Sequence, residues 1–144
     1  MAFIVTSSHV NQTTPSIEQL KKIVQSYSPP IDIRQIAKKL GLSIIEDIVM
    51  DKEISGCLEN KSGRWYIYVN AFHSEKRKRF TIAHEIAHFV LHSSNYLSFQ
   101  DVSFFRSPSS ESKEVEANKL AAEILMPEDK YIEEIKMDVI QYLH

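Results

Sequence analysis

Two histidines and a glutamate near the middle of the chain have the residue types and the spacing of a metal site. His84 and His88 are four residues apart, and Glu85 directly follows the first of them. Residues four apart on a helix lie on one face, one turn from each other, so both imidazoles can bind the same metal ion. Glu85 then lies beside the ion, where it can take a proton from an attacking water. This His-Glu-x-x-His pattern predicts zinc-assisted hydrolysis, most often of a peptide bond.

The helix that carries this motif, expected over residues 74–92, is apolar on nearly every side. Its apolar residues include Ile82, Ala83, Ile86, Ala87, Phe89, Val90 and Leu91. A helix of this kind is buried, and burying two imidazoles and a carboxylate without partners is costly. The alternative is a core helix in which the motif occurs by chance. We favour the metal site, because an ion would supply the partners.

A third ligand must come from another part of the chain, since a catalytic zinc ion has three protein ligands and one open position. A helix expected over residues 112–126 follows the motif and offers Glu111, Glu114, Glu116 and Glu123. At about 100° per residue, Glu114 lies near the apolar face of that helix, whereas Glu116 and Glu123 point away from it. Glu114 is therefore the preferred ligand. Glu116 stays as the alternative, because positions are blurred near the start of a helix.

The elements that must position these side chains follow from periodicity and turn residues. We expect further helices over residues 16–27, 32–40 and 128–139, and strands over 43–49, 54–59 and 64–70. These elements predict an α+β fold, in which a small antiparallel sheet packs against the metal-binding helix and flanking helices. We expect residues 1–144 to form one domain, with a flexible segment at 1–14 and a long loop at 93–112.

Composition excludes several classes of protein. The formal net charge of −2 gives no basic field for nucleic acid. A single cysteine, Cys57, excludes an internal disulfide framework and fits the reducing cytoplasm. No apolar run approaches the roughly 20 residues that a membrane helix needs. We therefore expect a cytoplasmic protein that binds neither membranes nor nucleic acid directly.

Two basic segments are compatible with DNA binding but do not favour it. Residues 33–43 resemble the first half of a helix-turn-helix, but a strand pattern follows where a recognition helix would be needed. Residues 76–79 are four consecutive cations at the start of a helix. We favour a solvated first turn with Arg79 packed inward. The alternative is a surface for an acidic partner or nucleic acid.

A resemblance to a known family rests on two longer segments. They are Arg79-Phe-Thr-Ile-Ala-His-Glu-Ile-Ala-His88 and Glu114-Val-Glu-Ala-Asn-Lys-Leu-Ala-Ala-Glu-Ile-Leu-Met-Pro127. Together with Ile54-Ser-Gly56 and Ile67-Tyr-Val-Asn70, they resemble the ImmA/IrrE family of zinc metallopeptidases over about residues 31–127. The resemblance implies a minimal zincin-like fold with Zn²⁺ held by His84, His88 and Glu114. It also implies a role encoded by mobile elements or linked to stress, in which a helix-turn-helix transcriptional repressor is cleaved or inactivated.

The expected mechanism assigns Glu85 as the general base. Tyr66, Tyr68 and His92 are candidates for stabilising the oxyanion, and His92 is alternatively a second-shell partner of the metal or a histidine at a helix C-terminus. The strand over 64–70 could offer an edge to an extended substrate. The leading function is a metallopeptidase that cleaves a specific regulatory protein. The alternatives are a zinc-binding module that sequesters a repressor or antitoxin without cutting it, and a DNA-binding regulator.

Overall fold

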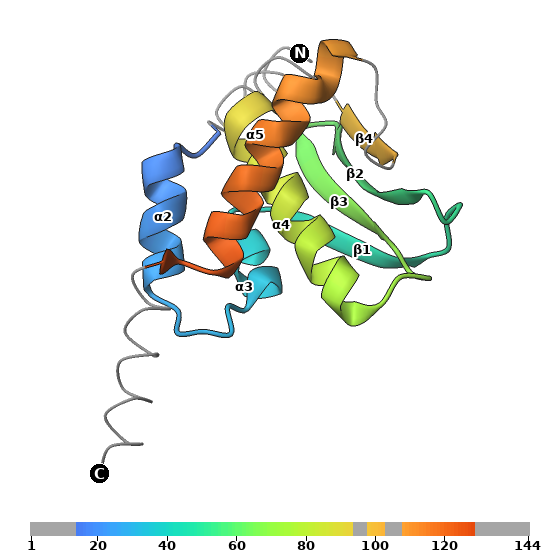
Figure 1. Ribbon diagram of the computed structural model, residues 1–144. Helices are drawn as coiled ribbons and strands as arrows, with labels where there is room; N and C mark the ends of the chain where they lie inside the picture. The colour runs from blue at the N-terminus through green and yellow to red at the C-terminus, as the bar shows by residue number, and fades with distance from the viewer. Residues whose placement is uncertain (1–13, 94–97, 103–107, 129–144) are drawn as a thin grey trace, which may run out of the picture.

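The computed structural model describes residues 14–93, 98–102 and 108–128 (Figure 1). Within these ranges the elements are α2 (Ile17–Gln25), α3 (Ile33–Lys39), β1 (Ser43–Ile48), β2 (Ile54–Lys61), β3 (Arg64–Asn70), α4 (Glu75–His92), β4 (Ser98–Val102) and α5 (Pro108–Leu125). This arrangement confirms the predicted α+β class. The segment expected to be flexible, 1–14, lies outside the described residues except for Thr14, and the helix expected over 128–139 lies outside them except for Glu128.

Three helices begin at the polar residues that cap them. Ser16 and Gln19 form a reciprocal capping box at the start of α2. The side chains of Asp32 and Ser74 each accept a hydrogen bond from the backbone N–H three residues later, at the starts of α3 and α4. Gly41 follows α3 with a φ of 82°, a left-handed conformation that favours glycine. The starts of these three helices, and the end of α3, are therefore determined by residues that are adjacent to them in the sequence.

The four strands form one sheet in the order β1-β3-β2-β4, with β2 antiparallel to both β3 and β4. The expectation of an antiparallel sheet was wrong for β1, which pairs with β3 in parallel. The chain reverses between β1 and β2 and again between β2 and β3. Two reversals restore the original direction, so β1 and β3 run the same way. Because β3 lies between β1 and β2 in the sheet, β1 pairs with β3 in parallel. Both edges of β3 are paired, so the substrate edge expected over residues 64–70 is not available.

The long loop expected over 93–112 is also shorter than predicted. β4 pairs with β2 across residues 98–102 and covers a sheet edge that would otherwise present unpaired backbone groups. α5 begins at Pro108, and proline is favoured in the first turn of a helix because its missing N–H would have no partner there. Residues 94–97 and 103–107 of this segment lie outside the described ranges.

Helix α4 is the central element, in contact with α2, α3, α5, β2 and β3. In Figure 1 the sheet lies behind α4 and the orange α5 crosses in front of it. The ring of Trp65 on β3 packs edge-on against Phe89 of α4, with 5.4 Å between centroids. A Cβ atom on Gly56 of β2 would overlap the carbonyl oxygen of Tyr68 and lie 2.9 Å from Cγ2 of Thr81 on α4. The close packing of sheet and helix therefore needs a glycine at this position.

Side chains from three elements anchor the start of α4. The Arg34 guanidinium of α3 donates to both carboxylate oxygens of Glu46 on β1 and to both of Glu75 on α4, at 2.8–3.0 Å. The Arg79 guanidinium donates to the backbone oxygen of Ile31 at 2.9 Å. This contact agrees with the expectation that Arg79 packs inward. The N-terminal end of the motif helix is thus fixed to α3 and to the sheet.

A fully buried asparagine organises the end of the sheet from which the chain enters α4. Asn70, at the end of β3, accepts hydrogen bonds at Oδ1 from the backbone N–H groups of Met50 and Phe72. Its Nδ2 lies 3.3, 3.1 and 2.9 Å from the carbonyl oxygens of Met50, Asp51 and Ile54. One side chain therefore satisfies the backbone of the β1–β2 connection and the turn that leads into α4.

Candidate metal centre

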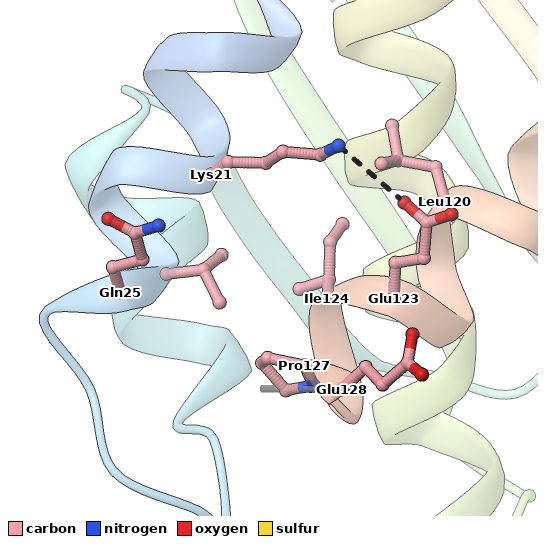
Figure 2. A pocket seen from close by; sticks show the side chains of 8 residues that line it. Lys21, Gln25, Leu120, Glu123, Ile124, Pro127 and Glu128 are labelled. Atoms are coloured by element: carbon pink, nitrogen blue, oxygen red, sulfur yellow. Dashed lines mark ion pairs between the residues drawn. The ribbon is translucent and has the colours of Figure 1, made fainter. Parts of the chain in front are cut away.

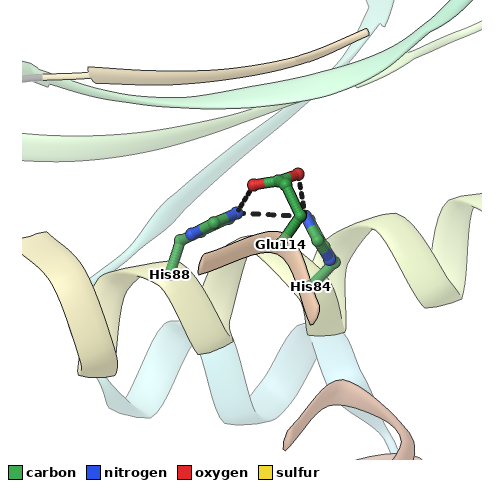
Figure 3. A group of neighbouring side chains, drawn as sticks. All are labelled: His84, His88 and Glu114. Atoms are coloured by element: carbon green, nitrogen blue, oxygen red, sulfur yellow. Dashed lines mark hydrogen bonds and ion pairs between the residues drawn. The ribbon is translucent and has the colours of Figure 1, made fainter. Parts of the chain in front are cut away.

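His84, His88 and Glu114 meet between α4 and α5 (Figure 3). The two histidines lie one turn apart on α4, and Glu114 extends from α5 across both imidazoles. Nε2 of His88 is 2.7 Å from one Glu114 oxygen, and Nε2 of His84 is 3.3 Å from the other. The two Nε2 atoms are 3.1 Å apart. The structure therefore brings together the two motif histidines and the glutamate that the sequence analysis preferred.

These separations fit a tetrahedral metal ion. Zinc binds imidazole nitrogen and carboxylate oxygen at about 2.0–2.2 Å, which places neighbouring ligand atoms about 3.3 Å apart. The three contacts of 2.7–3.3 Å lie near that value. Two imidazoles and one carboxylate are also a usual ligand set for a catalytic metal, and such a set keeps a fourth position open. The chemistry and the spacing of this group both fit a metal.

Burial divides the site into a closed side and a more open side. The His88 side chain is fully buried, and 8% of the His84 side chain is exposed. Glu85, the expected base, is fully buried in the same helix. Glu114 keeps 20% of its side chain exposed. Solvent therefore reaches the group from the side of Glu114, while the histidines are held in the core.

His92 lies on the side of His88 that faces away from the candidate metal. The Nδ1 atoms of the two rings are 3.0 Å apart. Because His88 must offer the lone pair of Nε2 to a metal, we assign the shared proton to its Nδ1, which then donates to His92. Burial lowers the pKa of His92. A neutral His92 can accept this bond, which fits a role in orienting the His88 ring toward a metal.

Three other predicted candidates lie away from the three ligands. Side chains alternate along β3, and Trp65 faces α4, so Tyr66 and Tyr68 lie on the opposite face of the sheet. The Tyr68 hydroxyl is 3.3 Å from a Glu59 oxygen there. The structure does not bring either tyrosine to the three candidate ligands. Glu116 has 58% of its side chain exposed, and its carboxylate lies 3.8 Å from Nε2 of His92.

One residue next to the candidate ligands was not among the predicted site residues. Phe80 precedes His84 by four residues on α4, and the centroids of the two rings are 6.2 Å apart. The residue keeps an exposed fraction of 40% although it is aromatic and lies beside a buried histidine. The i, i+4 spacing before His84 was a signal that could have identified it.

A separate pocket lies between α2 and the C-terminal part of α5 (Figure 2). Lys21 of α2 and Glu123 of α5 form an ion pair of 4.0 Å across it. The other lining residues are Val24, Gln25, Leu120, Ile124, Pro127 and Glu128. None of the three candidate metal ligands lines this pocket, so it is not part of the candidate metal centre.

The amino-acid sequence matches the model of a known protein family. The sequence model of the Peptidase_M78 family, described as the IrrE N-terminal-like domain, matches residues 37–139. The chain belongs to the ImmA/IrrE family. Membership of this family supports a metallopeptidase-type function. In this ImmA/IrrE chain, the residues that can hold a metal are His84, His88 and Glu114. No match was found among curated proteins. Within the described residues, no helix of this ImmA/IrrE chain is long and apolar enough to cross a membrane.

Proposed function

We propose that this protein is a zinc-dependent metallopeptidase that cleaves a specific regulatory protein, a helix-turn-helix transcriptional repressor. The observation that carries the proposal is the position of Glu114, whose two oxygens lie 2.7 and 3.3 Å from the Nε2 atoms of His88 and His84. Membership of a metallopeptidase family supports the same reaction. A repressor substrate places the reaction in the cytoplasm.

Each residue of the site has a distinct task in this proposal. His84, His88 and Glu114 hold the ion, and His92 orients His88 through Nδ1. When bound, zinc polarises the scissile carbonyl and lowers the pKa of water. The Glu85 carboxylate takes a proton from the attacking water and returns it to the leaving nitrogen of the peptide. The buried position of Glu85 excludes competing solvent from that transfer.

The choice of a repressor as substrate rests on the resemblance of the two motif segments to the ImmA/IrrE family. The partly exposed side chain of Glu114 leaves the candidate site accessible from solvent. A specific protein substrate also fits a fold in which α5 supplies both a ligand and a border of the site.

The experiment is a comparison of cells that express the wild-type protein or Glu85→Gln. New protein N-termini are identified by mass spectrometry, and zinc in both purified proteins is measured by elemental analysis. We expect new N-termini within a helix-turn-helix regulator in wild-type cells only, with zinc retained by both proteins. Equal N-termini in both cell lines would contradict the proposed reaction. Cleavage confined to proteins of another class would retain the peptidase and reject the repressor.

A further inference from the structure

The four consecutive cations at the start of α4 do not have equivalent surroundings. Arg79 donates to a backbone oxygen. Hydrogen bonds from Arg34, and to a smaller extent the charge of Lys78, lower the pKa values of both Glu46 and Glu75. Arg77 is exposed and donates only to a neutral group, the hydroxyl of Ser55 on β2, at 3.2 Å. Among the side chains that the structure describes, no carboxylate pairs with Arg77.

Arg77 lies on the face of α4 that carries the metal ligands. It precedes His84 by seven residues, close to two complete helical turns. At about 100° per residue, it projects about 20° from His84 and about 20° from His88, between the two. Lys76 projects about 80° from His84 on the other side, by the same rule. Arg77 thus continues the line of the two histidines toward the start of the helix, and Lys76 does not.

An irregularity in the sheet positions the partner of Arg77. The pairing of β2 with β4 shifts register between Ile54 and Gly56, so Ser55 is the extra residue of a bulge. A bulge redirects the side chain of the extra residue. The Ser55 hydroxyl then holds the guanidinium between α4 and the sheet. Since a guanidinium has five N–H donors, most of them stay available for an incoming acceptor.

Phe80 occupies the space between Arg77 and the metal ligands along the helix. Its ring lies 6.2 Å from the His84 ring, and 40% of the residue is exposed. The helical rise places Arg77 about 10 Å from His84 along the axis. An extended peptide advances about 3.3 Å per residue, so this distance corresponds to about three residues. Along α4, the candidate ligand His84 is therefore followed by the exposed ring of Phe80 and then by the guanidinium of Arg77.

We propose that Arg77 is a specificity-determining residue that binds an acidic side chain of the protein substrate about three residues from the scissile bond. Phe80 contacts the apolar part of the segment between them. This inference rests on the proposed peptidase function, and it names the chemistry of the substrate segment. An arginine can bind a carboxylate through two parallel N–H···O bonds, which makes the pairing directional.

The test uses a tryptic digest of a bacterial proteome as a peptide library. Zinc-loaded wild type, Arg77→Gln and Lys76→Gln are each incubated with it, and the sequences around the cleaved bonds are read by mass spectrometry. The immobilised Glu85→Gln protein, with and without Arg77→Gln, captures peptides from the same library as a binding readout. Because Arg77 is exposed, we expect its replacement to leave the fold intact. Circular dichroism checks that each variant is folded.

We expect acidic residues to be enriched about tenfold at one position near the third residue from the cut. The enrichment falls to about background in Arg77→Gln, persists in Lys76→Gln, and weakens at high salt because the pair is near the surface. The peptides captured by Glu85→Gln show the same enrichment, and it disappears when Arg77→Gln is added.

The outcomes separate this inference from the peptidase function. Cleavage without an acidic preference, or a preference lost equally in Lys76→Gln, would overturn the role of Arg77 and leave the peptidase intact. Arg77-dependent capture of acidic peptides without any cleavage would reject the peptidase and support the acid-binding role. Neither capture nor cleavage would overturn both.

Discussion

Nε2 of His88 lies 2.7 Å from a carboxylate oxygen of Glu114, although the two residues belong to different helices. Glu114 also reaches His84, so the contact between α4 and α5 is made by potential metal ligands as well as by apolar residues. Metal binding and the docking of α5 are therefore coupled. A change at Glu114 affects both.

The first prediction concerns metal content. Glu114→Ala should reduce bound zinc from about one ion per chain to near zero at micromolar free metal, because two histidines alone leave the ion without its third ligand. Glu116→Ala is the matched control and should keep the ion, since 58% of the Glu116 side chain is exposed. Elemental analysis after gel filtration gives the answer. Zinc retained by the Glu114 variant but lost from the Glu116 variant would reverse the assignment.

The second prediction concerns the orientation of His88. His92→Leu removes the group 3.0 Å from Nδ1 of His88 while keeping an apolar side chain in the core. We expect the dissociation constant for zinc to rise about 10- to 100-fold, the usual cost of losing a partner of a metal-binding histidine. Competition with a chromogenic chelator measures it. Glu116→Gln leaves the His88–His92 contact in place and should change affinity less than threefold. Equal affinities for His92→Leu and wild type would exclude the orienting role.

The third prediction concerns the buried asparagine that supports the turn before α4. In Asn70→Asp, an acceptor replaces the Nδ2 donor that lies within 3.3 Å of three carbonyl oxygens. We expect the free energy of unfolding to fall by about 3 kcal/mol, since buried groups lose their partners. Asn60→Asp makes the same chemical change but keeps the oxygen that accepts from the Gly63 N–H, and it should cost less than about 1 kcal/mol. Urea unfolding of both variants tests this, and equal losses would refute the special role of Asn70.

The fourth prediction concerns acid stability. Hydrogen bonding to Arg34 lowers the pKa of Glu46 below its ordinary value of 4.5. The folded protein therefore holds the ionised form more strongly than the unfolded chain does. The resulting stability is fully present above the unfolded pKa and is lost as pH falls through the lowered folded pKa.

The measurement compares wild type with Glu46→Gln by urea unfolding at several pH values between 7 and 3. Because 34% of the Glu46 side chain is exposed and solvent screens the pair, we expect a difference of at most about 1 kcal/mol at pH 7. The difference should shrink below about pH 4.5. The site histidines are present in both proteins, so their titration cancels. A difference that grows with acidity would have the wrong sign for this mechanism.

The parts of the site that the sequence could predict depend on short-range patterns. The spacing of His84 and His88, and the cap at Ser74, define α4 locally. Helical periodicity favoured Glu114 over Glu116, and the three ligands meet in the structure. Each of these inferences needs only the geometry of a single helix, which is why one amino-acid sequence was sufficient.

The parts that could not be predicted depend on which elements become neighbours. The pattern of β1 marks a strand but contains no information on its partner, so its parallel pairing with β3 was missed. β4 was missed because its serine-rich surroundings look like a loop, and its pairing partner, β2, lies far away in the sequence. The link from Arg34 to Glu46 and Glu75 joins three elements and has no local signature.

The position of β3 between β1 and β2 also sets the order in which the protein can assemble during synthesis. When β1 and β2 emerge from the ribosome, the strand that pairs with both is not yet made, and their facing backbone groups stay unpaired until Asn70 has followed. The ligands converge later still, once α5 has been translated and has docked. The nascent chain therefore completes the group of His84, His88 and Glu114, which could hold a metal ion, only after α5 has been made.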